Sequence, residues 1–352
     1  MLRVLALTKY DRLAASARMR FVQFEPGLLE RGIELSISPL FDDRYLKERF
    51  DSGRQKPEHV LRALVRRARA LVEARSWDLA VVCYELFPYL PPLFEQAALL
   101  GLPYVFDFDD AIFHTYDQHP RALVRRVLGD KLSRVIHGAR SVIAGSDYLA
   151  EYARRSNPKV HLIPTVIDLD RYRVRTGPKK PGPFTVGWIG SPSTSTYLDL
   201  VAGPLQRLAQ EGPLKLLAVG AAPRSIPGVD VEIRPWSEER EVADLLECDV
   251  GIMPLTDTPW SRGKCAFKLI QYMACGLPVV ASPVGANQEV VTSDCGAFAR
   301  DDEAWQAALR RLRDTPALAE AQGRAGRARA EAHYSLQSQL DPLAQIFRQA
   351  VG

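Results

Sequence analysis

The sequence lacks paired cysteines and long apolar runs. Its five cysteines are scattered, and none forms a Cys-x-x-Cys pair. This odd, unpatterned set argues against a disulfide framework or a zinc site and is typical of a reduced, cytosolic protein. No apolar run reaches the roughly 18 residues that a membrane-spanning helix needs. The N-terminal segment reads as a first β-strand and lacks the apolar core and cleavage site of a signal peptide.

A strong excess of charge of one sign is also missing. The net charge is +4, far from the dense basic surface of a dedicated nucleic-acid binder, so no nucleic-acid partner is expected. A mildly basic chain suits an anionic small substrate or an anionic membrane surface. With 352 residues, 47% of them hydrophobic and 25% charged, the chain is expected to form two globular domains.

Continuously apolar segments alternate with helical patterns throughout the chain. This alternation predicts an α/β fold in which parallel sheets are covered by helices on both faces. Two of the expected helices are 17–31 and 121–137. The expected strands are 2–7, 33–38, 79–83, 104–107, 141–144 and 161–163 in the first half, and 184–189, 214–219, 231–233, 250–253 and 278–281 in the second.

A segment rich in Pro, Gly and Lys, 175–183, separates the two halves and is typical of an interdomain linker. We therefore predict two Rossmann-like domains, 1–174 and 184–335, that face each other across a cleft. The remaining residues, 336–352, have the apolar spacing of an amphipathic helix, which we expect to pack back on the first domain. Ligands of such sheets bind beyond the carboxyl ends of the strands, so functional residues are expected in the loops that follow strands.

The most informative segment is 262–290, RGKCAFKLIQYMACGLPVVASPVGANQEV. A basic glycine loop leads into a predicted helix, 267–274, whose N-terminus would present free N–H groups to a phosphate. Arg262, Lys264 and Lys268 add positive charge nearby. The segment therefore predicts a phosphate site, although a solvated basic helix start would give the same local pattern.

Acidic residues form a second candidate site. The strand in PYVFDFDDAIFH ends in three carboxylates, Asp107, Asp109 and Asp110, which repel one another unless they have partners or shifted pKa values. We expect Asp109 or Asp110 to contact a substrate hydroxyl. The alternatives are metal binding and capping of the following helix.

Two further loops follow predicted strands. The loop after the first strand has no glycine, but Ser16, Arg18 and Arg20 stand there, and an arginine fork can clamp a phosphate. Equally, these arginines fit a charged surface. Later, Gly190-Ser191 forms a tight turn at a strand end, which permits close approach of a nucleotide.

Residues 269–285, LIQYMACGLPVVASPVG, resemble the signature of the retaining glycosyltransferases of GT-B fold, a family that includes glycogen-synthase-like and mannosyl-transferring enzymes. The segments 142–155, 159–172 and 244–255 resemble further elements of that family in the same order. Together the matches cover most of 140–350. The resemblance implies a nucleotide diphosphate sugar as co-substrate and no metal or other cofactor.

The sequence departs from this family at its two signature glutamates. In an alignment on MACG, Gln271 occupies the position of the second family glutamate and Gly263 occupies the position of the first. The resemblance implies that the second contacts the ribose, which Gln271 can still do, and that the first contacts the transferred sugar, for which Gly263 has no side chain. The resemblance also places Asp109 in a loop that meets acceptor and donor sugar, Gly190 beside the diphosphate and Trp236 near the nucleobase. A Trp packed between the two domains is the alternative for Trp236.

These expectations combine into a glycosyltransferase that moves a sugar to an acceptor hydroxyl in glycan, polysaccharide or glycolipid biosynthesis. The expected catalytic residues are Asp109, Asp110, Lys264 and Lys268. The expected donor-binding residues are Ser16, Arg18, Gly190, Ser191, Trp236, Arg262, Gly263, Gln271, Gly285 and Glu289. Two rivals remain: a nucleotide-sugar epimerase of the same fold, and a catalytically silent scaffold, which the loss of both glutamates favours.

Two basic amphipathic segments, 61–75 and 121–140, bear on where the protein acts. Each fits a solvated face of a core helix, and each also fits contact with an anionic membrane. Such contact would suit a lipid-linked saccharide acceptor. The expected location is therefore the cytoplasm, with peripheral contact at the inner face of the cell membrane as an alternative.

Overall fold

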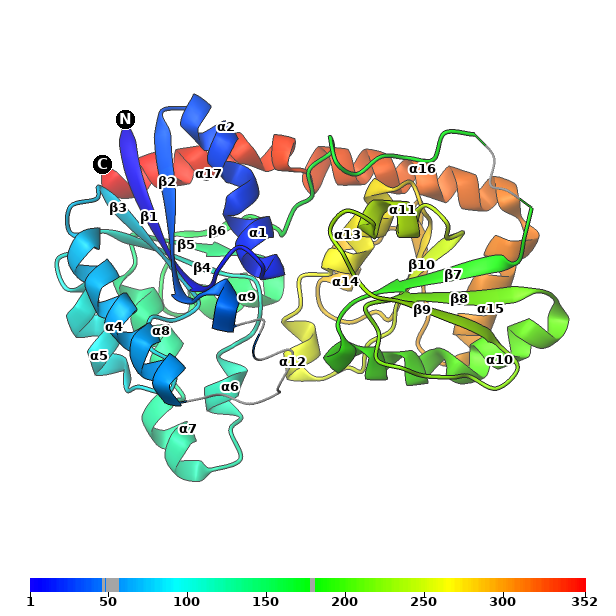
Figure 1. Cartoon of the computed structure of the whole chain (residues 1–352), viewed down its shortest axis with the longest axis horizontal. Coiled ribbons are helices and arrows are strands. Elements are labelled where there is room, and N and C mark those ends of the chain that lie inside the picture. Colours follow the sequence, from blue (N-terminus) through cyan, green and yellow to red (C-terminus); the bar gives the residue numbers. More distant parts are fainter. Residues whose placement is uncertain (46–47, 49–56, 178–180) are drawn as a thin grey trace. The chain divides into compact units, whose positions relative to one another are not determined.

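The computed structural model describes residues 1–45, 48, 57–177 and 181–352, which divide into two compact units (Figure 1). Unit 1 comprises Met1–Val166, Gly263–Cys265 and Ser338–Gly352. Unit 2 comprises Ile167–Arg262 and Ala266–Gln337. Most of the predicted linker 175–183 is part of unit 2, and its residues 178–180 lie outside the described residues.

Unit 1 is built on a six-stranded parallel sheet with the strand order β2-β1-β3-β4-β5-β6. Its central strands are buried along their whole length, which explains their continuously apolar sequence. The strands are β1 (Leu2–Tyr10), β2 (Ile33–Phe41), β3 (Leu79–Cys83), β4 (Tyr104–Phe108), β5 (Ser141–Ala144) and β6 (Val160–Leu162). The connecting helices include α4 (Pro57–Ala74), α5 (Pro92–Leu99), α6 (His114–Asp117) and α9 (Asp147–Arg154).

Two helices predicted in unit 1 are each broken. The predicted helix 17–31 is wrong as one element, because α1 (Ala15–Arg20), a 3-10 turn (Val22–Phe24) and α2 (Glu25–Glu30) take its place. Pro26 explains the break, since proline is tolerated in the first turn of α2 but not inside a helix. The predicted helix 121–137 is likewise split into α7 (Ala122–Leu128) and α8 (Lys131–Gly138) by Gly129 and Asp130, two residues that favour helix ends.

Unit 2 repeats the architecture with the strand order β12-β11-β10-β7-β8-β9, again parallel throughout. The three-residue strand β12 was not among the predicted strands. The strands are β7 (Phe184–Ile189), β8 (Leu214–Val219), β9 (Asp230–Arg234), β10 (Val250–Met253), β11 (Val279–Ala281) and β12 (Gly296–Phe298). The helices include α10 (Ala202–Glu211), α11 (Glu241–Leu245), α12 (Pro259–Arg262), α13 (Phe267–Ala274), α14 (Asn287–Val290), α15 (Asp302–Asp314) and α16 (Pro316–His333).

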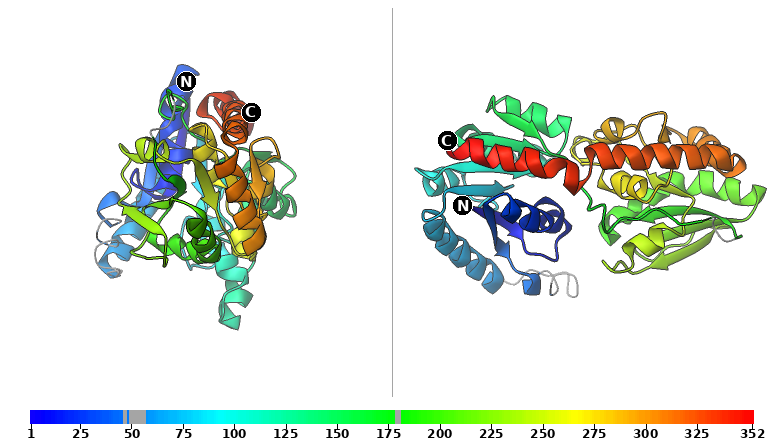
Figure 2. Two further views of the ribbon diagram at one scale, coloured as in Figure 1. Left: turned by 90° about the vertical axis from the view of Figure 1, so that its right-hand side faces the viewer. Right: turned by 90° about the horizontal axis from the view of Figure 1, so that it is seen from above.

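The last helix, α17 (Leu336–Val351), packs for most of its length within unit 1 (Figure 2). Leu340 lies directly over Gly27, where a β-carbon would come within 2.3 Å of its methyl group. Arg31 pairs with Asp341 at 2.5 Å, and Arg348 donates to the Arg31 carbonyl at 2.7 Å. Within the part of the chain that the structure describes, no helix is both long and apolar enough to cross a bilayer.

Candidate active site

The carboxyl end of β4 carries the three acids of unit 1, and the first of them is neutralised inside the core. Asp107 accepts a two-pronged hydrogen bond from Arg20, at 3.1 Å from Nε and 2.5 Å from Nη2. Arg20 also donates to the Ile163 carbonyl at 2.6 Å, and both charged side chains are buried. The Arg20 guanidinium is therefore engaged by Asp107 inside the core, and it fits neither of the two expectations from the sequence, a phosphate clamp or a charged surface.

The other two acids lie side by side at the edge of the sheet. Asp109 accepts one hydrogen bond from the Tyr84 hydroxyl and another, at 3.3 Å, from Thr165. Burial and the neighbouring charge of Asp109 raise the pKa of Asp110 to about 7, although Lys264 opposes the shift. The pair therefore combines a carboxylate fixed by two hydroxyls with a carboxyl that holds a proton near neutral pH.

Residues Gly263–Cys265 pack against this acidic loop within unit 1. The Cys265 thiol donates to the Asp109 carbonyl at 2.7 Å. A β-carbon on Gly263 would lie 2.1 Å from the Ala111 side chain and 3.0 Å from its backbone nitrogen. Any side chain at position 263 would therefore collide with the chain that follows the acids, which gives a physical reason for a glycine where the family has a glutamate.

Tyr84, which the sequence reasoning missed, follows β3 directly and has a left-handed backbone, with φ at 66°. A bulky residue in that region costs about 1–3 kcal/mol and persists only where its surroundings hold it. The available signal was positional: β3 pairs with β4, so the residue after Cys83 lies beside the acids at the same sheet edge.

In unit 2, glycines line the carboxyl ends of β7 and β8. Gly190 follows β7, and a β-carbon there would lie 2.5 Å from the Trp188 ring and 2.6 Å from the Lys268 ammonium. Lys268 stands over the Trp188 ring at 4.1 Å from its centroid. Gly220, after β8, has φ at 75° and lies against the Gly190 carbonyl. The backbone of two glycines and the Lys268 ammonium thus lie close together at the carboxyl edge of the sheet.

Two helical segments begin beside these glycines. Ser191 opens the 3-10 segment Pro192–Val201 through a capping box with Thr194. Lys268 lies in the first turn of α13, which Ala266 precedes with a left-handed backbone, φ 54°. Helix N-termini attract anions, and here one of them carries a lysine.

The carboxyl end of β9 carries a buried hydrogen-bond chain. Trp236, 36% exposed, donates its indole N–H to Glu241 at 2.6 Å. Tyr172 donates to the same carboxylate, and Gln271 donates to the Tyr172 hydroxyl at 2.8 Å. Gln271 is only 3% exposed, so its amide supports Tyr172 and Glu241 from inside the core. Glu241 and Tyr172 were missed because only the fold brings these distant residues together.

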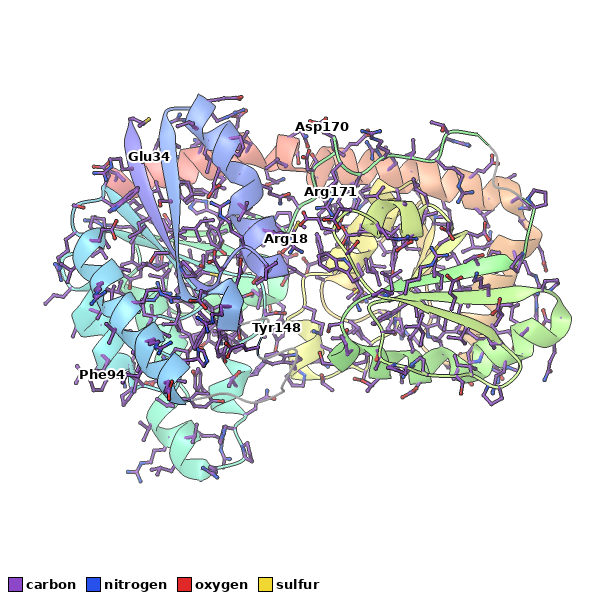
Figure 3. The ribbon with its side chains drawn as sticks, in the orientation of Figure 1. Arg18, Glu34, Phe94, Tyr148, Asp170 and Arg171 are labelled. Atoms are coloured by element: carbon purple, nitrogen blue, oxygen red, sulfur yellow. The ribbon has the colours of Figure 1, made fainter. Side chains whose placement is uncertain are left out.

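The remaining predicted residues lie at several places. Gly285 has φ at 51° and lets the Arg262 carbonyl approach, while Arg262 itself pairs with Asp257 at 2.6 Å. Glu289 lies half-buried in the short helix α14. Ser16 and Arg18 lie on α1 in unit 1, where Arg18 donates to the Leu13 carbonyl at 2.8 Å (Figure 3). Nothing tests the substrate contacts predicted for these residues, which stay predictions.

Comparison with known proteins agrees with this architecture. Residues 183–315 match the protein family described as Glycosyl transferases group 1. No curated protein has a significantly similar sequence. Among solved structures, the sucrose-phosphate synthase of Thermosynechococcus elongatus matches with a TM-score of 0.72, 17% identity and 99% of each chain covered.

Two further structures match over nearly their whole length. A glycosyltransferase of Rickettsia africae has a TM-score of 0.71 and 12% identity, with 99% of this chain and 98% of that one covered. HepE of Anabaena, in complex with UDP-glucose, has a TM-score of 0.71 and 14% identity, with 99% of this chain and 100% of that one covered. These likenesses confirm the predicted fold class, two parallel sheets with flanking helices of the GT-B type.

Proposed function

Through residues 183–315 the chain belongs to the group 1 glycosyl transferases, and from this premise we propose that it moves a sugar from a UDP-sugar to an acceptor hydroxyl with retention. The observation that carries the proposal is the meeting of Gly190 and the Lys268 ammonium at the carboxyl edge of the unit 2 sheet. A diphosphate needs both close backbone approach and a positive charge, and this point of the fold offers both.

The choice of uridine rests on the HepE structure, which contains UDP-glucose. In this chain Trp236 is the proposed partner of the base, because its indole is held by Glu241 and remains partly exposed. Gly190 and Ser191 would border the diphosphate. Gln271 would act through Tyr172 and not by direct contact with the ribose, since its side chain is buried.

In unit 1 we assign the contact with the transferred sugar or the acceptor hydroxyl to Asp109 and Asp110. Their support is the placement of the two carboxyl groups at a sheet edge with Lys264 nearby. Catalysis would then rest on positioning and on stabilisation of the leaving diphosphate by Lys264 and Lys268. The acceptor would be a saccharide or a lipid-linked saccharide of a glycan, polysaccharide or glycolipid pathway.

The test is nucleotide binding by calorimetry, followed by turnover of a UDP-sugar panel. Lys268→Ala should weaken UDP binding by about tenfold or more, the effect of losing one charged hydrogen bond. Lys215→Ala is the matched control, because Lys215 pairs with Glu232 on the strands β8 and β9 of the same unit. Equal UDP affinity in wild type and Lys268→Ala would refute the phosphate assignment.

The same measurements separate the two rivals. An epimerase would convert the sugar nucleotide without any acceptor, which chromatography of donor-only reactions detects. A catalytically silent scaffold would bind none of UDP, GDP and ADP. Transfer to an added saccharide acceptor would exclude both.

We also propose that α4 gives unit 1 a contact with an anionic membrane, where a lipid-linked acceptor would be found. Arg67 is buried and Arg66 pairs with Asp42, but Arg62 and Arg69 are exposed. Beside them, large apolar side chains of α4 face solvent, among them Leu61, Val65 and Val72, at 65%, 45% and 73% exposure. Exposed apolar groups flanked by arginine match an anionic lipid surface.

Flotation with phosphatidylglycerol vesicles tests this contact. Wild type should float with these vesicles and not with phosphatidylcholine vesicles, and Val72→Glu should reduce flotation severalfold. Leu29→Glu is the control, because Leu29 is an equally apolar, 56% exposed residue on α2. No flotation of the wild type, or self-association in its place, would contradict the membrane contact.

A further inference from the structure

The turn after β3 holds Tyr84 in a conformation that a tyrosine rarely adopts. Its φ of 66° lies in the left-handed region, and Tyr89 in the same turn has φ at 61°. Neither residue is a glycine, so the turn must be held by contacts strong enough to keep this backbone.

A buried ionic cluster supplies these contacts. Lys131 is fully buried and lies 3.0 Å from both Glu85 and Glu95. Its ammonium also donates to the Phe87 carbonyl at 2.5 Å, and the Phe87 N–H donates to Glu95 at 3.1 Å. Glu85 and Phe87, which follow Tyr84 in the chain, and Glu95 in α5 are therefore fixed to one another around a single lysine.

Glu85 has two further partners. Tyr116 donates to it at 2.5 Å, and Lys9 lies 3.3 Å away. Burial opposes the ionisation of Glu85, but Lys131 and Lys9 hold the pKa of this carboxyl below its ordinary value. An ionised Glu85 gives Lys131 a permanent partner, so the cluster keeps its hold on the turn near neutral pH.

The left-handed backbone at Tyr84 determines where the Tyr84 hydroxyl lies. The Tyr84 side chain is 6% exposed, and its hydroxyl donates to Oδ1 of Asp109. Thr165 donates to Oδ2 of the same carboxylate at 3.3 Å. Burial, with Asp109 second, raises the pKa of Tyr84 well above its ordinary value, so the phenol keeps the proton that it donates.

We propose that Tyr84 is a positioning residue: the clamped turn directs its hydroxyl onto Asp109 and, together with Thr165, fixes the orientation of that carboxylate beside Asp110. This inference rests on the proposed function, because it assigns a role to the acids at that site. Packing alone does not require the hydroxyl, since a phenylalanine would fill the same space. It does not require the left-handed backbone either.

Tyr84→Phe removes only this hydroxyl, and Tyr104→Phe is its matched control. Both wild-type residues are buried tyrosines of unit 1 that donate a hydrogen bond, but Tyr104 donates to the Val135 carbonyl at 2.5 Å and not to Asp109 or Glu85. We expect Tyr84→Phe to lower kcat for UDP-sugar turnover by about tenfold or more, the effect of one hydrogen bond to a charged group. KM and UDP affinity should change less than twofold, because Tyr84 contacts Asp109, whereas Trp236, Gly190 and Lys268, the residues proposed to bind the base and the diphosphate, belong to unit 2.

The pH dependence separates positioning from packing. In Tyr84→Phe the acidic limb of the kcat profile should move up by about one pH unit, because the carboxylate has lost a donor that favours its charged form. Tyr104→Phe should lose thermal stability and keep the wild-type profile. A Tyr84→Phe enzyme that has the wild-type pH profile and loses only stability would overturn the proposal.

A second readout does not depend on activity. In full-length protein labelled with ¹³C at the aspartate carboxyls, Asp110→Asn identifies the resonances of the acid pair. The more acidic titration step of the pair should move up in Tyr84→Phe and stay in Tyr104→Phe. If Asp109→Asn retained full turnover, the acid assignment under the proposed function would fail, and this titration would still decide whether Tyr84 controls the pair.

Discussion

Replacing Arg20 by methionine should lower the stability of unit 1 without changing the affinity of the protein for UDP. Methionine keeps the length of the side chain and removes its charge, which leaves Asp107 without its partner in the core. Both side chains are nearly inaccessible, 2% and 4% exposed. Removing one member of a buried pair costs about 3–5 kcal/mol, because the other charge stays buried.

That loss is large enough to measure directly. A domain of this size loses roughly 2–4 °C of Tm per kcal/mol, so calorimetry of Arg20→Met should show a decrease of roughly 6–20 °C in the unit 1 transition. Burial already raises the pKa of Asp107, while Arg20 opposes the shift. Without Arg20 the carboxyl takes up a proton more readily, so the variant should lose less stability at pH 5 than at pH 8.

The control is Arg12→Met, which removes an exposed pair with Glu25 at 2.7 Å. Exposed pairs contribute about 0–1 kcal/mol, so its Tm should hardly move. UDP affinity should stay at the wild-type value in both variants. An unchanged Tm together with weaker UDP binding in Arg20→Met would refute the reasoning and restore Arg20 as a phosphate clamp.

Three further outcomes are expected. Because burial and Asp109 raise the pKa of Asp110 from 3.8 to about 7, the folded state binds the additional proton, so stability should fall as pH rises from about 4 to 7, and Asp110→Asn should flatten this slope in Tm measured against pH. Gly190→Ala would place a methyl group 2.6 Å from the Lys268 ammonium and should weaken UDP binding by about tenfold or more in calorimetry, whereas Gly212→Ala, with no atom within 4 Å, should not. Trp236→Leu should weaken UDP binding by roughly 5–100-fold if the base stacks there, and Trp236→Phe should lose much less.

The strands were predictable because burial on both faces makes them continuously apolar. Phe184–Ile189 and Leu214–Val219, for example, have the predicted bounds. The break in the predicted helix 17–31 was not predictable in the same way, because the apolar spacing continues across Pro26 although the helical backbone is interrupted there. The resemblance to the glycosyltransferase family, carried by 269–285, is confirmed by the match of 183–315.

Side-chain partnerships were the least predictable part of the candidate site. Three acids at one strand end look alike in sequence, but Arg20 neutralises Asp107 alone, from 87 positions away. Gln271 was expected to contact the ribose, but in the fold its amide donates to the Tyr172 hydroxyl, 99 positions earlier. In the sequence, Gly263 was only the loss of a family glutamate. The structure supplies a reason for the glycine, because a β-carbon there would collide with Ala111.

Unit 1 is assembled from three separate stretches of chain, the last of which is Ser338–Gly352. During synthesis, α17 is therefore made after unit 2, and it cannot pack against the rest of unit 1 until all of unit 2 has left the ribosome. The surface of α2 around Gly27 and Arg31 stays bare during that interval. A nascent chain in this state would be open to chaperones and proteases, so stop codons placed before residue 338 should reduce the yield of soluble protein even though both sheets are fully encoded.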